Sequence, residues 1–101
     1  MALRWHLYIV RCRGGTLYTG IATDVARRFA EHQGNSSKAA KYLRGKGPLE
    51  LVFEKVIGGN KRVALSVERQ IKSLSKSRKE SIIIHNNLID VIVIRAERRC
   101  Y

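Results

Sequence analysis

Cysteine, proline and acidic side chains are all scarce in this sequence of 101 residues. Its two cysteines, Cys12 and Cys100, are too few for a disulfide framework. Neither lies in a Cys-x-x-Cys or Cys/His spacing that would hold zinc. A single proline together with an apolar content of 45% argues against disorder. We therefore expect one globular unit in a reducing, cytoplasmic environment.

Long hydrophobic runs, internal repeats and linkers are absent as well. The N-terminal apolar stretch, Leu7 to Val10, is too short for a signal peptide or a membrane span, and Arg11 and Arg13 follow it closely. We expect no membrane partner. A chain of this length buries about 60 to 70% of its extended surface, which is enough for one modest core.

Basic residues are abundant: twenty Lys and Arg against eight Asp and Glu give a formal net charge of +12. The charge is clustered, because residues 38–46 contain four basic residues and no acid, and residues 55–79 contain eight and a single acid, Glu68. Such clusters suit a polyanionic backbone, where each neutralised phosphate releases counterions. The alternative is a solvated basic surface without a partner. We favour nucleic acid.

Hydrophobic periodicity and turn signals predict an α+β domain. The chain is divided in order into a hairpin of strands over 5–12 and 17–21, a helix between Thr23 and Gly34, a short basic helix over 38–44, a strand over 49–57, and helices over 61–75 and 76–84. Thr23 is the expected N-cap of the first helix. This order, β-β-α-(α)-β-α-α, implies a three-stranded mixed or antiparallel sheet flanked by helices.

The end of the chain is harder to interpret. We take residues 1–84 as the main domain and 85–101 as a C-terminal extension. The Ile- and Val-rich stretch from Leu88 to Ile94 favours a strand, which would pack on the domain or form a dimer contact.

Helical geometry separates the adjacent arginines of the first predicted helix. If Val25 and His32 face the core, Arg28 borders the buried stripe and Arg27 points away, because each residue advances about 100° around the axis. Arg28 is thus the arginine that can reach a site, unless it only covers the edge of the core with its methylenes. His32 has an equally simple alternative as a half-buried core histidine.

Glu68 borders the sheet-facing side of its predicted helix and is the only acid in a strongly basic stretch. A carboxylate weakens phosphate binding unless it has another task, and holding Mg²⁺ is such a task, since Mg²⁺ takes one or two carboxylates plus waters and phosphate oxygens. The alternative is a surface ion pair with Lys72, four residues on. Tyr8 and Tyr18 lie on the two hairpin strands, where tyrosine is common.

Tyr18-Thr19-Gly20, followed by Thr23-Asp24-Val25, Arg28 and His32, resembles the second half of the GIY-YIG nuclease signature. His6-Leu7-Tyr8 stands where that family has Gly-Ile-Tyr, and Glu68 stands where it keeps a metal-binding glutamate. The run from Tyr42 to Val52, with Ala64, Ile71 and Lys72, is similar to the small single-domain bacterial branch of the family. The resemblance covers roughly residues 5–79. It departs from the family at His6, and no role is assigned to Asn86 or Asn87.

The resemblance implies one-metal hydrolysis of a phosphodiester bond in DNA, with RNA as a further possibility, in repair or recombination. Tyr18 would accept the proton of the attacking water, Tyr8 would support it, and Arg28 would hold the phosphate. Glu68 would bind Mg²⁺ or Mn²⁺, and His32 would orient Tyr18 or transfer protons. A protein partner is possible.

Nucleic acid would be bound by residues of the two basic clusters, namely Lys38, Lys41, Arg44, Lys46 and Lys72. Two competing interpretations remain open. A catalytically weak or inactive binding module would hold nucleic acid equally well in chelator and would lose affinity only with salt. A scaffold protein would show no salt-sensitive binding at all.

Overall fold

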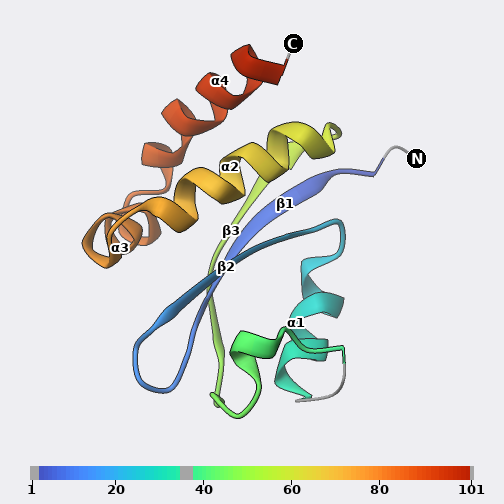
Figure 1. The fold of residues 1–101 in the computed structure, drawn as a ribbon, viewed down its shortest axis with the longest axis vertical. Coiled ribbons are helices and arrows are strands. Elements are labelled where there is room, and N and C mark those ends of the chain that lie inside the picture. Colours follow the sequence, from blue (N-terminus) through green and yellow to red (C-terminus); the bar gives the residue numbers. More distant parts are fainter. Residues whose placement is uncertain (1–2, 35–37, 101) are drawn as a thin grey trace.

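The computed structural model describes residues 3–34 and 38–100, and it forms the predicted α+β fold (Figure 1). The elements run in the order β1 (Trp5–Arg11), β2 (Leu17–Ala22), α1 (Val25–Gln33), the 3₁₀ turn η1 (Lys41–Leu43), β3 (Glu50–Gly58), α2 (Lys61–Ser73), α3 (Lys76–Ile84), η2 (Asn86–Leu88) and α4 (Ile89–Cys100). The three strands form one antiparallel sheet in the order β2-β1-β3. The order of the sheet leaves β2 at one edge.

Alternation along β1 creates two hydrophobic layers, one on each face of the sheet. Leu7 and Ile9 are fully buried on one face, against the helices that follow β3. Tyr8 and Val10 are buried on the other face, in a cluster that includes Val25 of α1. The central strand is therefore covered on both sides, which fixes its register.

Helix α2 packs across the face of the sheet that carries Leu7 and Ile9 and contacts all three strands. Helix α4 packs on the outer side of α2 (Figure 1). The inward stripe of α2 consists of Val63, Val67 and Ile71, each at most 2% exposed, at the spacing of a single helical face. Burying one such side chain contributes roughly 1.5 to 3 kcal/mol. This stripe fixes the rotation of α2 and with it the direction of Glu68.

The second face is covered by α1 and η1, which lie across the sheet from α2 (Figure 1). Val25 and His32 of α1 are buried, as the periodicity predicted, and Phe29 between them is partly buried. The cap of α1 differs from the prediction: Asp24, not Thr23, is the N-cap, and its side chain accepts a hydrogen bond from the Arg27 backbone N–H at 3.1 Å. A carboxylate at this position also suits the helix dipole.

The predicted strand from Leu88 to Ile94 is wrong, because this stretch forms η2 and the start of α4. Ile89, Ile92, Val93 and Ala96 recur at helical spacing and pack into the same core cluster as the α2 stripe. Strand propensity of Ile and Val is overridden here by the apolar surface of α2, which accepts a helical stripe.

The predicted basic helix over residues 38–44 is reduced to the three residues of η1. Within this segment Ala39 is 4% exposed and Leu43 is 1% exposed, so both anchor it to the core. The hairpin turn forms as predicted: Gly15 has a φ of +90°, which favours glycine, and its N–H donates to the Cys12 carbonyl at 2.8 Å. Cys12 and Cys100 are both free thiols. None of the helices in the described ranges has the length and apolarity needed to cross a membrane.

Candidate active site

Tyr8 is the centre of the predicted site and is almost wholly buried, at 1% exposure. It lies on β1 opposite Gly20 of β2, and a Cβ on Gly20 would come within 2.5 Å of the Tyr8 hydroxyl and 2.6 Å of Cζ. The phenol therefore lies directly over the Gly20 backbone and points towards the β2 edge of the sheet. This contact is the physical reason for glycine in the Tyr18-Thr19-Gly20 segment.

His32 connects the Tyr8 phenol to the segment that precedes η1. Its Nε2 lies 2.9 Å from the Tyr8 hydroxyl, and its Nδ1 accepts a hydrogen bond from the Ala40 backbone N–H at 3.3 Å. A neutral imidazole that accepts at Nδ1 carries its proton on Nε2, so His32 donates to the Tyr8 oxygen. The Tyr8 O–H is then directed to another acceptor. Both ring nitrogens of His32 are engaged, which suits a positioning role better than proton transfer.

The charges around this pair favour neutral forms of both groups. Burial lowers the pKa of His32, and the Arg28 charge lowers it further. Burial raises the pKa of the Tyr8 phenol, and the neighbouring Tyr18 and Glu68 side chains add to the rise while Arg28 opposes it. Tyr8 is therefore a protonated hydrogen-bond donor at neutral pH. Tyr18, Arg28 and Glu68 thus lie near enough to Tyr8 for their charges to affect its pKa.

Tyr18 is held by its ring. Its centroid lies 6.4 Å from that of Tyr8, 5.6 Å from that of His32 in an edge-on arrangement, and 6.0 Å from that of Tyr42 in a stacked arrangement. No hydrogen bond between described residues uses the Tyr18 hydroxyl, which is thus available to an external group. Tyr18 is also less buried than Tyr8.

Arg28 is half-buried, with 33% of its side chain exposed, whereas Arg27 is 78% exposed. The helical geometry inferred from the sequence is therefore confirmed. The Nη1 atom of Arg28 donates to the Glu31 carboxylate at 3.0 Å and also to the Lys38 carbonyl oxygen. These contacts tie α1 to the segment that leads into η1. They fix one corner of the guanidinium beside Tyr8.

Glu68 comes from α2, on the face of the sheet opposite α1, and is 19% exposed. It forms the ion pair with Lys72 that the sequence offered as the alternative, at 3.6 Å between Nζ and Oε2. That pair does not exclude a role in the site, because the carboxylate also acts on the Tyr8 phenol. The site is therefore assembled from both faces of the sheet around the edge strand β2.

The donor set around Glu68 fits some metals better than others. Among the described residues, His, Cys, Asp and Glu side chains form no group of three or more that could hold a metal ion. Zinc requires three or four protein ligands, and calcium takes six to eight oxygen atoms. Mg²⁺ keeps several of its waters and needs one or two carboxylates, so a single Glu68 fits Mg²⁺ better than it fits zinc or calcium.

A cleft of about 410 Å³ adjoins this constellation, and we call it the edge cleft. It is lined by Leu17, Tyr18, Thr19, Tyr42, Lys72 and Lys79. No individual role was predicted from the sequence for Tyr42 or Lys79, the two residues of the cleft that can contact a nucleic acid and were not predicted to. An aromatic residue within the basic run 38–46 is a signal for Tyr42 that spacing alone did not single out. Lys79 carries no comparable signal, because α3 approaches β2 only in the folded chain.

The other predicted nucleic-acid contacts are distributed around the same region. Lys72 lines the edge cleft, and Lys46 places its Nζ 3.6 Å from the centroid of the Tyr42 ring. Lys41 is exposed on η1, and Arg44 caps η1 at its C-terminal end. Lys38 contributes its carbonyl oxygen to Arg28. The structure thus groups these residues on the side of the sheet that carries η1, except Lys72 on α2.

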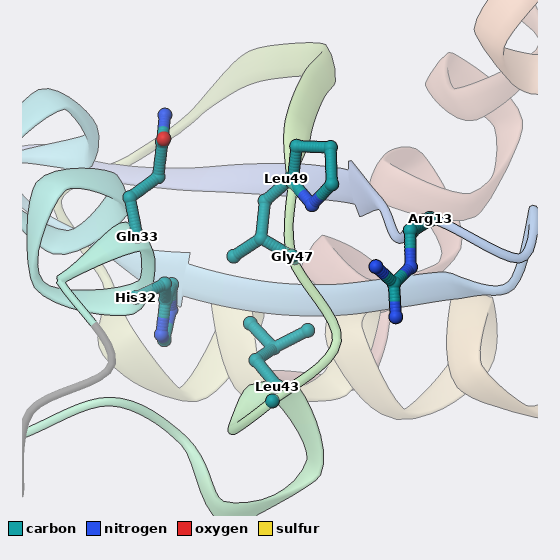
Figure 2. Close-up of a pocket in the computed structure, with 8 residues that line it drawn as sticks. Arg13, His32, Gln33, Leu43, Gly47 and Leu49 are labelled. Carbon is teal, nitrogen blue, oxygen red and sulfur yellow. The ribbon is translucent and has the colours of Figure 1, made fainter.

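A second cavity, of about 240 Å³, is lined in part by His32 (Figure 2). Arg13 is at one end of it and His32 at the other, with the apolar side chains of Leu43 and Leu49 between them. His32 is the residue that this cavity shares with the site. The buried imidazole is thus packed between Tyr8 on one side and this cavity on the other.

Comparisons with known proteins agree with this geometry. Residues 4–81 match the GIY-YIG catalytic domain family. The chain is 50% identical over 90 residues to a UPF0213 protein of Vibrio cholerae serotype O1 (strain O395), covering 89% of this chain and 87% of the relative. It is 54% identical over 80 residues to a UPF0213 protein of Yersinia pestis (strain Pestoides F), covering 79% and 81%.

A solved structure is similar as well. The solution NMR structure of a UPF0213 protein from Bacillus halodurans has a TM-score of 0.50 and 38% sequence identity, covering 79% of this chain and 82% of that one. The signature residues, the three-stranded sheet and these matches agree with one another. The chain belongs to the GIY-YIG family of catalytic domains, a family of nucleases.

Proposed function

We propose that this protein is a metal-dependent nuclease that hydrolyses phosphodiester bonds in DNA by a one-metal mechanism. The observation that carries the proposal is the convergence of Tyr8, Tyr18, Arg28 and Glu68 around the edge strand β2, next to a cleft lined by two lysines. These groups come from four elements and from both faces of the sheet. A structural ion pair or a solvated basic surface does not require such a convergence.

Tyr18 is the proposed proton acceptor. The oxygen of an attacking water forms a bond to phosphorus, its proton passes to the Tyr18 oxygen, and the bond from phosphorus to the leaving oxygen breaks. An ordinary tyrosine of pKa about 10 is about 0.1% ionised at pH 7, so a tyrosine that acts as a base at this pH requires about 4 kcal/mol of stabilisation of its phenolate. In this proposal Arg28 and the Tyr8 O–H, which is free to donate because His32 donates to its oxygen, are the groups that face the negative charge developing during proton transfer.

Arg28 is the proposed phosphate ligand. Its guanidinium is a planar fork of donors that matches two phosphate oxygens, which a lysine ammonium does not reproduce. The contacts of Nη1 to Glu31 and to the Lys38 carbonyl hold the fork in one orientation before substrate binds. Such preorganised donors stabilise the negative charge that develops on the phosphate.

Glu68 is the proposed ligand for Mg²⁺ or Mn²⁺. A bound divalent cation supplies Lewis-acid stabilisation of phosphate charge and a more acidic water. Lys72 would then exchange its ion pair with Glu68 for a contact with the phosphate backbone. Lys79 of the edge cleft, with Lys38, Lys41, Arg44 and Lys46, supplies the remaining positive charge along the bound strand.

DNA is the proposed substrate, in repair or recombination, because a net charge of +12 on so small a surface favours a long polyanion. The test uses purified protein with labelled single-stranded, duplex and branched DNA, and with RNA, in Mg²⁺, in Mn²⁺ and in chelator. Cleavage that requires the metal and disappears in Glu68→Gln is the expected result.

A matched control is Glu97→Gln, which makes the same change of charge at an exposed position on α4. It should cleave like the unsubstituted protein. Binding that is equal in metal and in chelator, with no cleavage of any substrate, would overturn the nuclease proposal and support a nucleic-acid-binding module. If the unsubstituted protein neither bound nor cleaved nucleic acid at any salt concentration, the scaffold interpretation would be supported.

A further inference from the structure

Tyr42 lines the edge cleft but has no part in the proposed chemistry, and its ring contacts Tyr18 and Lys46. The Tyr42 and Tyr18 rings are stacked, with centroids 6.0 Å apart and planes inclined by 22°. Lys46 Nζ lies over the Tyr42 ring at 3.6 Å from its centroid, well within the range of a cation–π contact. Tyr42 is nevertheless 43% exposed, so core packing alone does not explain its position.

The backbone around Tyr42 is anchored on both sides. Ala40 is the N-cap of η1 and donates its N–H to His32 Nδ1, the same imidazole whose other nitrogen contacts Tyr8. Leu43 ends η1 and is 1% exposed. Further along, the Lys46 carbonyl accepts a hydrogen bond from the Arg13 N–H at 3.1 Å, which ties Lys46 to the hairpin turn.

Tyr18 needs such support because its hydroxyl makes no hydrogen bond within the described residues. A phenol on an edge strand, less buried than Tyr8, can rotate about its side-chain torsions unless neighbouring rings restrict it. His32 contacts Tyr18 edge-on, with centroids 5.6 Å apart. The tilted Tyr8 ring, 6.4 Å away between centroids, is a second contact. The stacked Tyr42 is the third and the only one of the three that lies nearly parallel to the Tyr18 ring, so it restrains the face of that ring.

We infer that Tyr42 is a positioning residue that fixes the ring of Tyr18, and that Lys46 holds Tyr42 in place through its cation–π contact. This inference rests on the proposed function, in which Tyr18 accepts the proton from water. It assigns to η1 a task other than contact with the phosphate backbone. Tyr42 itself need not touch the substrate.

The test compares Tyr42→Phe, which keeps the ring, with Tyr42→Leu, which keeps apolar bulk and removes it. Tyr42→Leu should lower kcat about tenfold with KM unchanged, the factor that corresponds to loss of one aromatic pair. Tyr42→Phe should remain within about twofold of the original kcat, because stacking does not use the hydroxyl. Lys46→Met should lower kcat about two- to fivefold, as expected for a partly exposed cation–π contact.

Leu65→Ala is the matched control, since Leu65 is 39% exposed on α2 and has no place in the proposed site. It should leave kcat unchanged. A rise of KM in Tyr42→Leu with kcat unchanged would overturn the inference and make Tyr42 a substrate contact. Unchanged kinetics in Tyr42→Leu would overturn it as well.

A measurement without substrate separates this inference from the proposed function. Aromatic NMR spectra should show a nuclear Overhauser contact between the Tyr18 and His32 rings in the original protein and in Tyr42→Phe. That contact should weaken in Tyr42→Leu and not in Leu65→Ala. Its persistence in Tyr42→Leu would overturn the positioning role even if no DNA were cleaved. Its selective loss, in a protein that cleaves nothing, would retain the positioning of Tyr18 and reject the nuclease proposal.

Discussion

Replacing Gly20 by alanine tests the packing on which the site depends. A Cβ at this position would lie 2.5 Å from the Tyr8 hydroxyl, 2.6 Å from Cζ and 3.0 Å from Cε1. Carbon atoms in contact prefer a separation of about 3.5 to 4.0 Å, so the Tyr8 ring must retreat by about 1 Å. The ring is 1% exposed and is packed in a full core, so this movement displaces its neighbours.

The expected cost has two parts. Overpacking of a core costs about 1 to 3 kcal/mol, which lowers the midpoint of thermal unfolding by at least about 4 °C for a domain of this size. A shift of 1 Å also stretches the 2.9 Å contact between the Tyr8 hydroxyl and His32 Nε2 beyond hydrogen-bonding range. Misplacement on that scale reduces catalysis by about 100-fold.

Thermal unfolding and DNA cleavage of Gly20→Ala are measured beside those of Gly14→Ala. Gly14 is the matched control because a Cβ there meets nothing within 4 Å. A smaller stability loss for Gly20→Ala in a Tyr8→Leu background would assign the cost to this contact. If Gly20→Ala unfolded and cleaved DNA like the control, the account of the Tyr8 and Gly20 contact would be wrong.

Three further predictions follow from contacts in the site and beside it. Arg28→Lys should cleave DNA nearly as slowly as Arg28→Ala, because an ammonium lacks the two-donor fork, and full activity in the lysine variant would contradict the phosphate role. Burial, with help from Arg28, lowers the pKa of His32 in the fold, so its neutral form contributes stability above about pH 6.5 that is lost as the pH falls. The stability lost in His32→Gln, measured by urea unfolding, should thus be larger at pH 7.5 than at pH 5.5, and equal losses would refute this. Arg11 and Glu80 join β1 to α3 through two contacts of 2.6 and 2.8 Å, and Glu80→Gln should cost about 1 kcal/mol or less because both side chains are 30% exposed. Hydrogen bonding from Arg11 lowers the pKa of Glu80, so this cost should be present at pH 7 and disappear as the pH falls below the usual carboxyl range, and a cost that is the same at pH 3 would show another cause.

Most of the fold could be predicted from local patterns, since the hairpin, α1, β3, α2 and α3 each carry a periodicity or a turn signal of their own. Two exceptions are the predicted helix over residues 38–44, of which only η1 forms, and α4, where Ile and Val at helical spacing also have high strand propensity. Nothing local decides between the two structures for residues 88–94. The apolar outer surface of α2 decides it, and that surface exists only after α2 has packed on the sheet.

Within the site, the residue types and their local directions could be predicted from the sequence. Turn and strand signals place Tyr8 and Tyr18 on the two hairpin strands, helical spacing turns Arg28 inward and Arg27 outward, and Glu68 is conspicuous as a lone acid among bases. These features depend on short-range geometry, which a sequence encodes directly.

Which of these groups meet depends on how the elements pack in the folded chain. The Glu68 charge acts on Tyr8 although α2 and Tyr8 lie on opposite faces of the sheet. His32 engages both ring nitrogens, and Tyr42 stacks on Tyr18, because the segment after α1 folds back over the sheet. Such contacts join residues that are distant along the chain, and their geometry is set by the packing of whole elements, which no local pattern of residues encodes.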